Sequence, residues 1–384
     1  MTAKQRILGA MRRADVDYTP MVISWNETQK LHGRLSWGNE RERLAYAERM
    51  GWDTVVRTGA FVTPREVTVR RTIEEYGGKK ILRQTWETPA AVLREALNFT
   101  GDWDRSELGG DYLALSSDFR TPRYIEYPFN NAADIEALNY IFPENNPEDM
   151  KKIEDDYQTQ RGLADGFGCP LFLYLDAGMD WITWLYPITE GVCRAVDEPQ
   201  NIARILEIIN DAKYKRLMRL LELGVDGVIR RGWYECTDIW SPELLRRFAW
   251  PALVREIETV HDAGKLFAYT IDTGVKHIAP DLAKMGIDCF NGLDPVRGDM
   301  TVAETRAAFP DACLWGGFSG PGHFGAESPD MAARAAEEAM AAYGGRGLIL
   351  GMAASYRHYY PWENFLAAEN VWKRLRQGGH YGRM

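Results

Sequence analysis

Short runs of β-forming residues recur along the chain, and each is separated from the next by a stretch long enough to hold a helix or an insertion. Connections of this length are crossovers, so the runs are expected to pair in parallel rather than as hairpins. The predicted strands are Met21–Trp25, Thr54–Thr58, Leu171–Asp176, Gly227–Arg231, Leu266–Asp272, Cys289–Leu293, Cys313–Phe318 and Leu348–Ala353. Eight such strands predict the α/β class and, within it, a (β/α)8 TIM barrel.

Helix boundaries between these strands are marked by capping residues. Ser241-Pro242-Glu243 and Ser328-Pro329-Asp330 each place an N-cap, a first-turn proline and an acid in the order that starts a helix. Gly224 and Gly264 stand where a helix is expected to end. Near the N-terminus, Thr2 and Gln5 form a capping-box pair that predicts a first helix.

A long excursion separates the second predicted strand from the third. Its first part contains Glu66–Arg70 and Lys80–Trp86 on either side of Gly77-Gly78, which predicts an inserted β-hairpin. Its later part, Asp134–Leu163, is polar and helical, and prolines interrupt it. We expect one domain over residues 1–384, with an insertion over about 64–165 that covers the mouth of the barrel.

Composition excludes several classes of protein. Among 384 residues, Asp and Glu outnumber Lys and Arg by 55 to 46, and the net charge of −9 argues against nucleic acid. The first residues lack the continuous apolar run of a signal peptide, so we expect a cytoplasmic protein away from membranes. The five cysteines form no CxxC pair, which favours reduced thiols.

Polar residues gather at the carboxyl ends of the predicted strands, where a parallel barrel builds its active site. The candidates for general acid, general base or metal ligand are Glu27, Asp176, Glu235, Asp272 and His358. The candidates for substrate binding are Trp25, Asn26, Arg57, Arg230, Arg231, Tyr269, Asn291 and Tyr360. Each has a structural alternative: an acid could cap a segment or pair with an arginine, and Arg230-Arg231 could serve neighbouring acids.

Four segments in the second half of the chain carry a family resemblance. They are SPELLRRFAWPALVREIETVHDAGKLFAYTIDTG, MGIDCFNGLDP, LWGGFSGPG and GLILGMAASYRHYYPWEN, and they follow one another between Ser241 and Leu375. In order and spacing the chain resembles the uroporphyrinogen decarboxylase superfamily, weakly also through Gly168-Cys169-Pro170 and the first helix. The resemblance implies a (β/α)8 barrel. The superfamily also includes cobalamin-dependent methyltransferases that act on methylated thiols, amines and methoxy-aromatics.

Key positions depart from both branches of that superfamily. The arginine by which the decarboxylases bind propionates falls at Trp25, their substrate tyrosine at Asp176 and their C-terminal histidine at Ala354. The His-x-Cys pair and later cysteine that bind zinc in thiol methyltransferases fall at Thr270, Asp272 and Ala354. The chain is therefore expected to decarboxylate no tetrapyrrole and to lack the thiolate zinc site, while any other metal stays open.

Three functions remain after this comparison. The resemblance favours a corrinoid-dependent methyltransferase of the O-demethylase type, which moves a methyl group from a methoxylated or methylated small molecule to cobalamin on a partner protein. The first alternative is a decarboxylase or lyase of a small carboxylated substrate, with Arg57, Arg230 or Arg231 holding the carboxylate. The second is a non-catalytic small-molecule or corrinoid-binding protein. Relatives of this kind often pair, so a homodimer is also possible.

Overall fold

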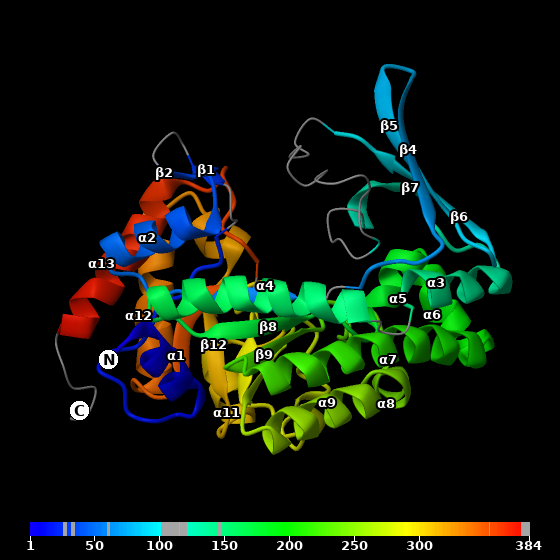
Figure 1. Cartoon of the computed structure of the whole chain (residues 1–384). Helices are drawn as coiled ribbons and strands as arrows, with labels where there is room; N and C mark the ends of the chain where they lie inside the picture. Colours follow the sequence, from blue (N-terminus) through cyan, green and yellow to red (C-terminus); the bar gives the residue numbers. More distant parts are fainter. Residues whose placement is uncertain are drawn as a thin grey trace.

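A computed structural model of the chain describes residues 1–25, 29–31, 35–59, 62–100, 115, 121–143, 147–352 and 354–377. Its centre is a curled parallel sheet of seven strands (Figure 1). Their order across the sheet is the same as their order along the chain. The strands of this sheet are β3 (Val56–Gly59), β8 (Leu171–Leu175), β9 (Gly227–Arg231), β10 (Leu266–Thr270), β11 (Cys289–Asn291), β12 (Cys313–Phe318) and β13 (Leu348–Met352). The α/β class and seven of the predicted strands are thereby confirmed.

Helices and helical turns join these strands. The helices before β8 are α1 (Ala3–Met11), α2 (Glu40–Met50), α3 (Leu138–Ile141) and α4 (Pro147–Gly166), with 3-10 turns η2 (Thr121–Arg123) and η3 (Ala132–Ala137). Those after β8 are α5 (Asp180–Leu185), α6 (Ile188–Asp197), α7 (Pro199–Leu223), α8 (Pro242–Phe248), α9 (Trp250–Asp262), α10 (Ala279–Leu282), α11 (Val302–Ala308), the π-helix η4 (Gly320–Phe324), α12 (Pro329–Tyr343) and α13 (Trp362–Gln377).

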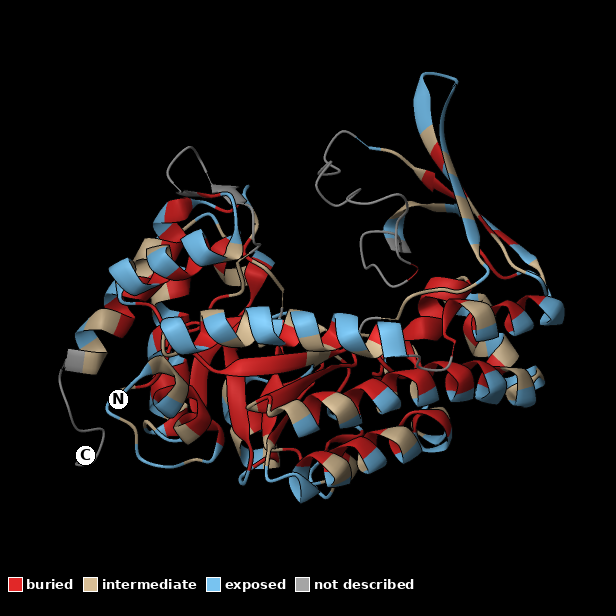
Figure 2. Cartoon of the chain, viewed as in Figure 1, coloured by how far each residue is buried: buried red, intermediate tan, exposed pale blue. Residues whose placement is uncertain are grey.

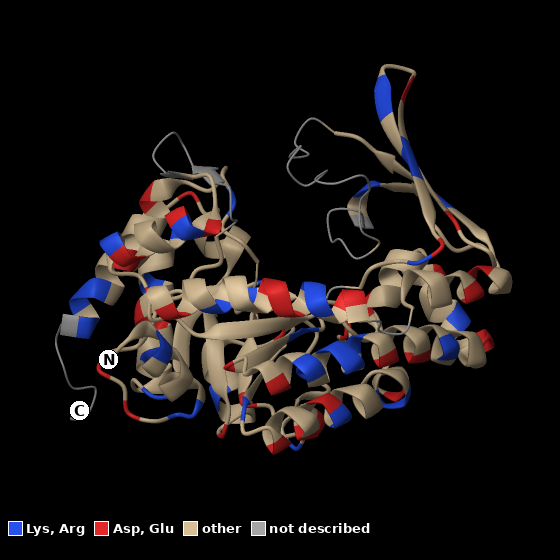
Figure 3. Cartoon of the chain, in the orientation of Figure 1, with Lys and Arg blue, Asp and Glu red and all other residues tan. Residues whose placement is uncertain are grey.

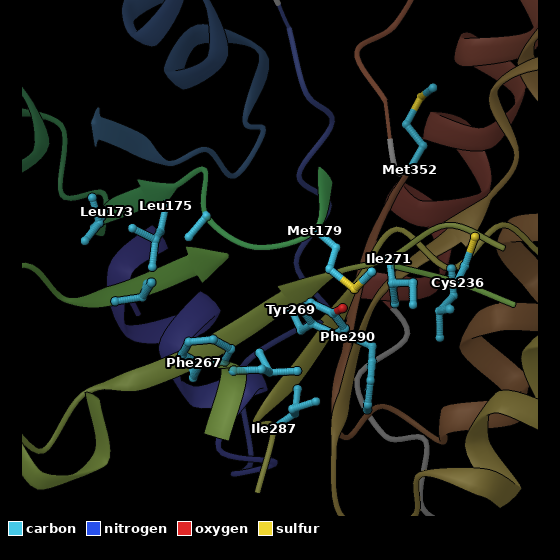
Figure 4. Packing of buried hydrophobic residues seen from close by; sticks show 14 of the residues in the cluster. Leu173, Leu175, Met179, Cys236, Phe267, Tyr269, Ile271, Ile287, Phe290 and Met352 are labelled. Carbon is cyan, nitrogen blue, oxygen red and sulfur yellow. The ribbon is translucent and has the colours of Figure 1, made fainter. Parts of the chain in front are cut away.

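Two apolar layers lie on opposite faces of the parallel sheet. Side chains alternate along each strand, so Leu173 and Leu175 pack outward under the helices while Phe172 points inward. Figure 4 shows the outward layer, in which Phe267 and Tyr269 of β10 lie among the buried residues. The inner layer is completed by apolar residues of α1, including Ile7 and Met11, which therefore cover part of the inner face.

The predicted first strand, Met21–Trp25, forms only an isolated bridge, between Met21 and Leu350 of β13. No ladder joins this segment to β3 within the described residues. Between this segment and β3, side chains form hydrogen bonds with backbone groups. The backbone amide of Met21 donates to the carboxylate of Asp53, and the Val55 carbonyl accepts from Arg43 at 2.8 Å. The structure thus gives a curled seven-stranded sheet with one bridged segment, rather than eight fully paired strands.

The excursion after β3 contains a separate antiparallel sheet. Its strands are β4 (Thr68–Tyr76), β5 (Lys79–Glu87), β6 (Val92–Asn98) and β7 (Tyr124–Glu126). Gly77 and Gly78 both have positive φ, of 58° and 74°, as the tight turn between β4 and β5 requires. The predicted hairpin is confirmed and is part of a larger sheet, which projects from the main body with an exposed tip (Figures 1 and 2). A further short pair, β1 (Gln29–Leu31) and β2 (Leu35–Trp37), follows the first bridge.

The predicted helix boundaries are confirmed by their hydrogen bonds. Ser241 accepts from the Leu244 amide and begins α8, whereas Gly224 ends α7 in the left-handed conformation. Pro147 begins α4, so this proline interrupts the helical part of the excursion as expected. Lys and Arg alternate with Asp and Glu along the outer faces of α4 and α7 (Figure 3). None of the described helices is both long and apolar enough to cross a bilayer.

Phe172→Ala is expected to destabilise the protein strongly, because Phe172 is fully buried within the inner layer. Removal of a buried phenylalanine side chain costs about 3–5 kcal/mol of unfolding free energy. Urea denaturation followed by circular dichroism measures the change. Ile73→Ala, at a half-exposed position on β4, is the control and is expected to cost under about 0.5 kcal/mol. Equal losses in the two variants would contradict the packing described.

Candidate functional site

A row of polar side chains crosses the inner face of the parallel sheet. Thr270 at the end of β10 lies in register with Arg231 of β9 and with Asn291 of β11. All three are at most 7% exposed. The Thr270 hydroxyl is buried and has no hydrogen-bond partner among the described residues. The backbone groups of these residues pair within the ladder, and their side chains lie at the carboxyl end of the sheet.

Asp272 follows this row and is held by an arginine. Arg297 donates to Oδ2 of Asp272 at 2.5 Å and to Oδ2 of Asp294 at 3.0 Å, so it bridges the two acids. The other oxygen of Asp272, Oδ1, is buried and accepts no hydrogen bond from any residue that the structure describes. Burial raises the pKa of Asp272 to about 6, against the lowering effect of Arg297 and with a smaller raising effect of Asp294. Asp272 therefore holds its proton to a higher pH than an exposed aspartate does.

Asp176, at the end of β8, lies in an ion pair. Lys213 of α7 contacts its Oδ1 at 2.7 Å, and the side chains are 6% and 17% exposed for Lys213 and Asp176. The backbone carbonyl of Asp176 accepts from the Trp181 indole at 2.8 Å. A carboxylate held this way is suited to position a neighbouring group or to neutralise Lys213.

Glu235 and Arg230 form a fully buried ion pair on the outer face. Glu235 accepts from Arg230, from Tyr269 Oη at 2.6 Å and from the Met179 amide at 2.7 Å, and Arg230 also contacts Glu256 at 3.2 Å. Burial raises the pKa of Tyr269 well above its ordinary value. This network lies between the sheet and the helices, so three predicted site residues, Arg230, Glu235 and Tyr269, are buried away from the inner face.

Gly178 permits the close packing of this network. Its φ is 83°, and a Cβ at this position would collide with Arg230 and Glu235. The turn after β8 therefore depends on glycine both for its backbone conformation and for the room that the ion pair takes.

Arg57 lines a cavity of about 90 Å³ at the seam between the first bridge and β3. Trp25, Ser24 and Gln160 are among the other residues that line it. The Arg57 side chain is accessible to solvent, yet loss of hydration lowers its pKa, as expected for a cation inside a concave site. Its guanidinium lies 5.3 Å from the centre of the Tyr174 ring.

Trp25 and Tyr360 lie in aromatic surroundings. The Trp25 ring stacks on Trp52 at 5.4 Å and contacts Tyr356 at 5.3 Å, besides lining the cavity. Tyr360 is 7% exposed and also contacts Tyr356, at 5.4 Å. His358 is exposed and contacts Tyr359. The predicted residues Asn26 and Glu27 lie outside the described residues.

Of the predicted acids that the structure describes, Asp176, Glu235 and Asp272 each contact a different cationic side chain. Among the described residues, no group of three His, Cys, Asp or Glu side chains is arranged to hold a metal ion. Thr270, Asp272 and Ala354 stand where the zinc ligands of the resembled thiol methyltransferases fall, and they supply no sulfur or imidazole nitrogen. The donor set at this position does not fit that zinc.

Sequence reasoning missed three residues of this site. Lys213 lies within α7, far from Asp176 in the sequence, and no local pattern indicates their contact. Tyr174 looked like an ordinary strand residue, although its ring is near both Arg57 and Arg231. Arg297 could have been found, because it follows Asp294 by three residues and the pair closes a local turn.

These features define an α/β protein whose inner sheet face carries polar and charged side chains at the carboxyl ends of its strands. The sequence matches the uroporphyrinogen decarboxylase family over residues 117–374, so the chain belongs to that family and the predicted resemblance is confirmed. No curated protein sequence matches the chain.

Two solved structures match the chain at low sequence identity. A methyltransferase from Methanosarcina mazei is 16% identical, with a TM-score of 0.56, over 98% of this chain and 99% of that protein. A B12-independent methionine synthase from Shewanella sp. W3-18-1, in complex with selenomethionine, is 11% identical, with a TM-score of 0.45, over 94% of this chain and 98% of that protein. The similarity to the methyltransferase structure supports the fold. At 16% identity it does not show which reaction this chain catalyses.

Glu235→Gln is expected to destabilise the protein by about 3–5 kcal/mol, because it leaves the buried Arg230 with one carboxylate fewer. Chemical denaturation at pH 7 measures this loss. Glu243→Gln is the matched control: Glu243 has a side chain 78% exposed and a long contact of 3.8 Å to Arg246. A Glu235→Gln variant of unchanged stability would contradict the structural role assigned to this network.

Proposed function

We propose that the protein is a methyltransferase that moves a methyl group from a methoxylated small molecule to cobalamin on a partner protein. The observation that carries the proposal is the carboxyl group of Asp272, which has a raised pKa and a buried oxygen without a partner in the described part of the chain. Membership of the family and the fold shared with a methyltransferase support it. The proposal includes a (β/α)8 barrel, with the bridged segment at Met21 as the eighth strand position.

Asp272 would act as the general acid. Cleavage of a methyl ether leaves an alkoxide or phenoxide, which is a poor leaving group unless a proton reaches the oxygen. Protonated Asp272 gives its proton to that oxygen as the carbon–oxygen bond breaks, so the products are an alcohol or phenol and the transferred methyl group. Cobalamin supplies the nucleophilic cobalt that accepts the methyl group. Arg297 stays bonded to Oδ2 and keeps the carboxyl group in place.

The buried hydroxyl of Thr270 would position the substrate. Thr270 lies two residues before Asp272 and in register with Asn291. Both side chains face the inner side of the sheet, as do Ala268 and Cys289, which lie two residues before them on the same strands. An ether or carbonyl oxygen can accept from the hydroxyl, which has no partner among the described residues. The unpartnered oxygens of Thr270 and Asp272 fit a small polar substrate group. These two oxygens have no role in binding the corrin ring, which a partner protein would present.

A second candidate is a decarboxylase or lyase of a small carboxylated substrate. The cation of Arg57 in its cavity favours this function, since a guanidinium can hold a carboxylate. Release of carbon dioxide without cobalamin would distinguish it from methyl transfer.

Asp272→Asn is expected to lower methyl transfer from a methoxylated substrate to cob(I)alamin by about 10²–10⁴-fold, because the amide cannot donate the required proton as an acid. In the unaltered protein the rate is expected to fall as pH rises through about 6, where Asp272 loses its proton. This pH dependence should be absent from the residual rate of the variant. The visible spectrum of cob(I)alamin follows the reaction, and metal content is assayed in the same sample.

Asp211→Asn, at an exposed position on α7, is the control and should keep both the rate and the pH profile. Thermal unfolding of each variant separates loss of chemistry from loss of fold. Methyl transfer that survives alanine at both Asp176 and Asp272 would show that the site is assigned wrongly.

A further inference from the structure

Strand β4 lies at one edge of the projecting antiparallel sheet. It pairs with β5 on one side, and no described strand pairs with its other side. All nine residues from Thr68 to Tyr76 pair with β5 in an unbroken register. The outer backbone groups of such an edge strand can pair with a strand from another molecule. β4 therefore has the backbone arrangement that accepts a further strand.

The opposite edge of the same sheet is protected from such pairing. β7 has only three residues, and its register with β6 shifts between Ala96 and Leu97. Short strands and bulges are devices by which proteins block the edges of their sheets. β4 is longer, and it has neither a register shift nor a proline. Of the two edge strands that the structure describes, β4 is thus the one suited to pairing.

The outer half of β4 exposes apolar side chains. Ile73 is 51% exposed and Tyr76 is 79% exposed, whereas Val69, nearer the main body, packs against the core. Figure 2 shows this exposed tip of the hairpin. Single exposed apolar residues are ordinary on a protein surface, but these two lie on one edge strand. A strand paired with β4 would contact both of them.

The charges of β4 are complementary to those of a second copy of β4. From residue 70 to residue 75 the sequence reads RRTIEE, so two arginines precede the centre of the strand and two glutamates follow it. When two copies run antiparallel, the arginine half of each strand faces the glutamate half of the other. Opposite charges on paired strands stabilise the pairing, and like charges oppose it. The same pattern would be repulsive in a parallel, in-register pair.

One register satisfies both the charged and the apolar residues. With Ile73 opposite Ile73 of the second copy, Arg71 lies opposite Glu75, and Arg70 lies opposite the ring of Tyr76. Paired residues then share a face of the sheet, as the alternation of side chains requires. An arginine beside a tyrosine ring is also a favourable contact. This register is symmetric, so each contact is made twice.

Ion pairs within the hairpin do not oppose this pairing. Arg70 contacts Glu87 at 3.0 Å and Arg83 contacts Glu74 at 2.8 Å, and all four side chains are at least 41% exposed. Exposed ion pairs contribute little to stability, so the side chains can adjust to a second strand. The hairpin projects from the main body (Figure 1), so antiparallel pairing places the two main bodies at opposite ends of the paired strands.

We propose that β4 is the interface of a homodimer, in which two copies of the hairpin pair antiparallel about a two-fold axis at Ile73 and form one continuous sheet. The sequence left a homodimer open, and this inference assigns its surface. It does not rest on the proposed methyl transfer. Because a contact between two strands is small, we expect a reversible dimer with a dissociation constant of about 10–100 µM.

Sedimentation equilibrium of the full chain, at about 5–500 µM, measures the dissociation constant. Glu75→Arg places an arginine opposite Arg71 of the second copy at two symmetric positions, and should raise the dissociation constant at least about 10-fold. The double variant Arg71→Glu with Glu75→Arg exchanges the two charges and should restore dimerisation to within about 3-fold. Glu258→Arg, at an exposed position on α9, is the matched control and should dimerise as the unaltered protein does.

Disulfide trapping tests the register directly. Residues opposite one another in antiparallel strands have Cα atoms about 4.5–5.5 Å apart, which a disulfide can span. In a Cys193→Ser background, which removes an exposed thiol, Ile73→Cys should form a covalent dimer when oxidised glutathione accepts the electrons of the two thiols. Tyr76→Cys is the control on the same strand, because its two copies would lie about 20 Å apart. Circular dichroism melting of each variant establishes that it folds.

Several results would overturn the inference. They are a protein that stays monomeric at every concentration, a dimer that Glu75→Arg does not weaken, a charge exchange that fails to restore a folded variant's dimer, and equal trapping of the Ile73→Cys and Tyr76→Cys variants. Assemblies that grow beyond the dimer would contradict the closed two-fold pairing. A dimer that depends on β4, in a protein without methyl transfer, would support this inference and count against the proposed function alone.

Discussion

Alternation of side chains across the parallel strands is the constraint on which the rest of this structure depends. Because successive residues point to opposite faces, each strand contributes to two separate environments. Phe172 and Tyr174 belong to the inner face, whereas Leu173 and Leu175 belong to the layer beneath the helices. The same rule sends neighbouring arginines apart: Arg230 faces outward, and Arg231 lies in the inner row with Thr270.

Charged side chains have different surroundings on the two faces of the sheet. On the outer face, charged groups are enclosed between apolar layers, so Arg230 is stable there only with Glu235 and Glu256 around it. On the inner face, near the carboxyl ends of the strands, Asp272 keeps an oxygen without a partner among the residues described, and Arg57 lines a cavity. A buried carboxylate oxygen without a described partner at the carboxyl end of a curled parallel sheet is typical of a ligand site.

The seam beside β3 links the fold to this site. A full ladder there would bring the first segment against β3, but Arg43 and Asp53 occupy backbone groups that such a ladder would use. The cavity with Arg57 opens along this seam. The incomplete pairing and the cavity thus lie at the same place, where side chains are inserted between the two segments.

The sequence by itself determined the order of the strands, the hairpin at Gly77-Gly78, the helix boundaries and the family, because these follow from local periodicity, capping and motifs. It also indicated which residues stand near strand ends. Only the tertiary structure decided which of them share an environment. Lys213 neutralises Asp176 from a distant helix, and Tyr269 turns away from the inner face to meet Glu235. The physical reason is that ion pairing and burial depend on packing between distant segments, which local sequence does not encode.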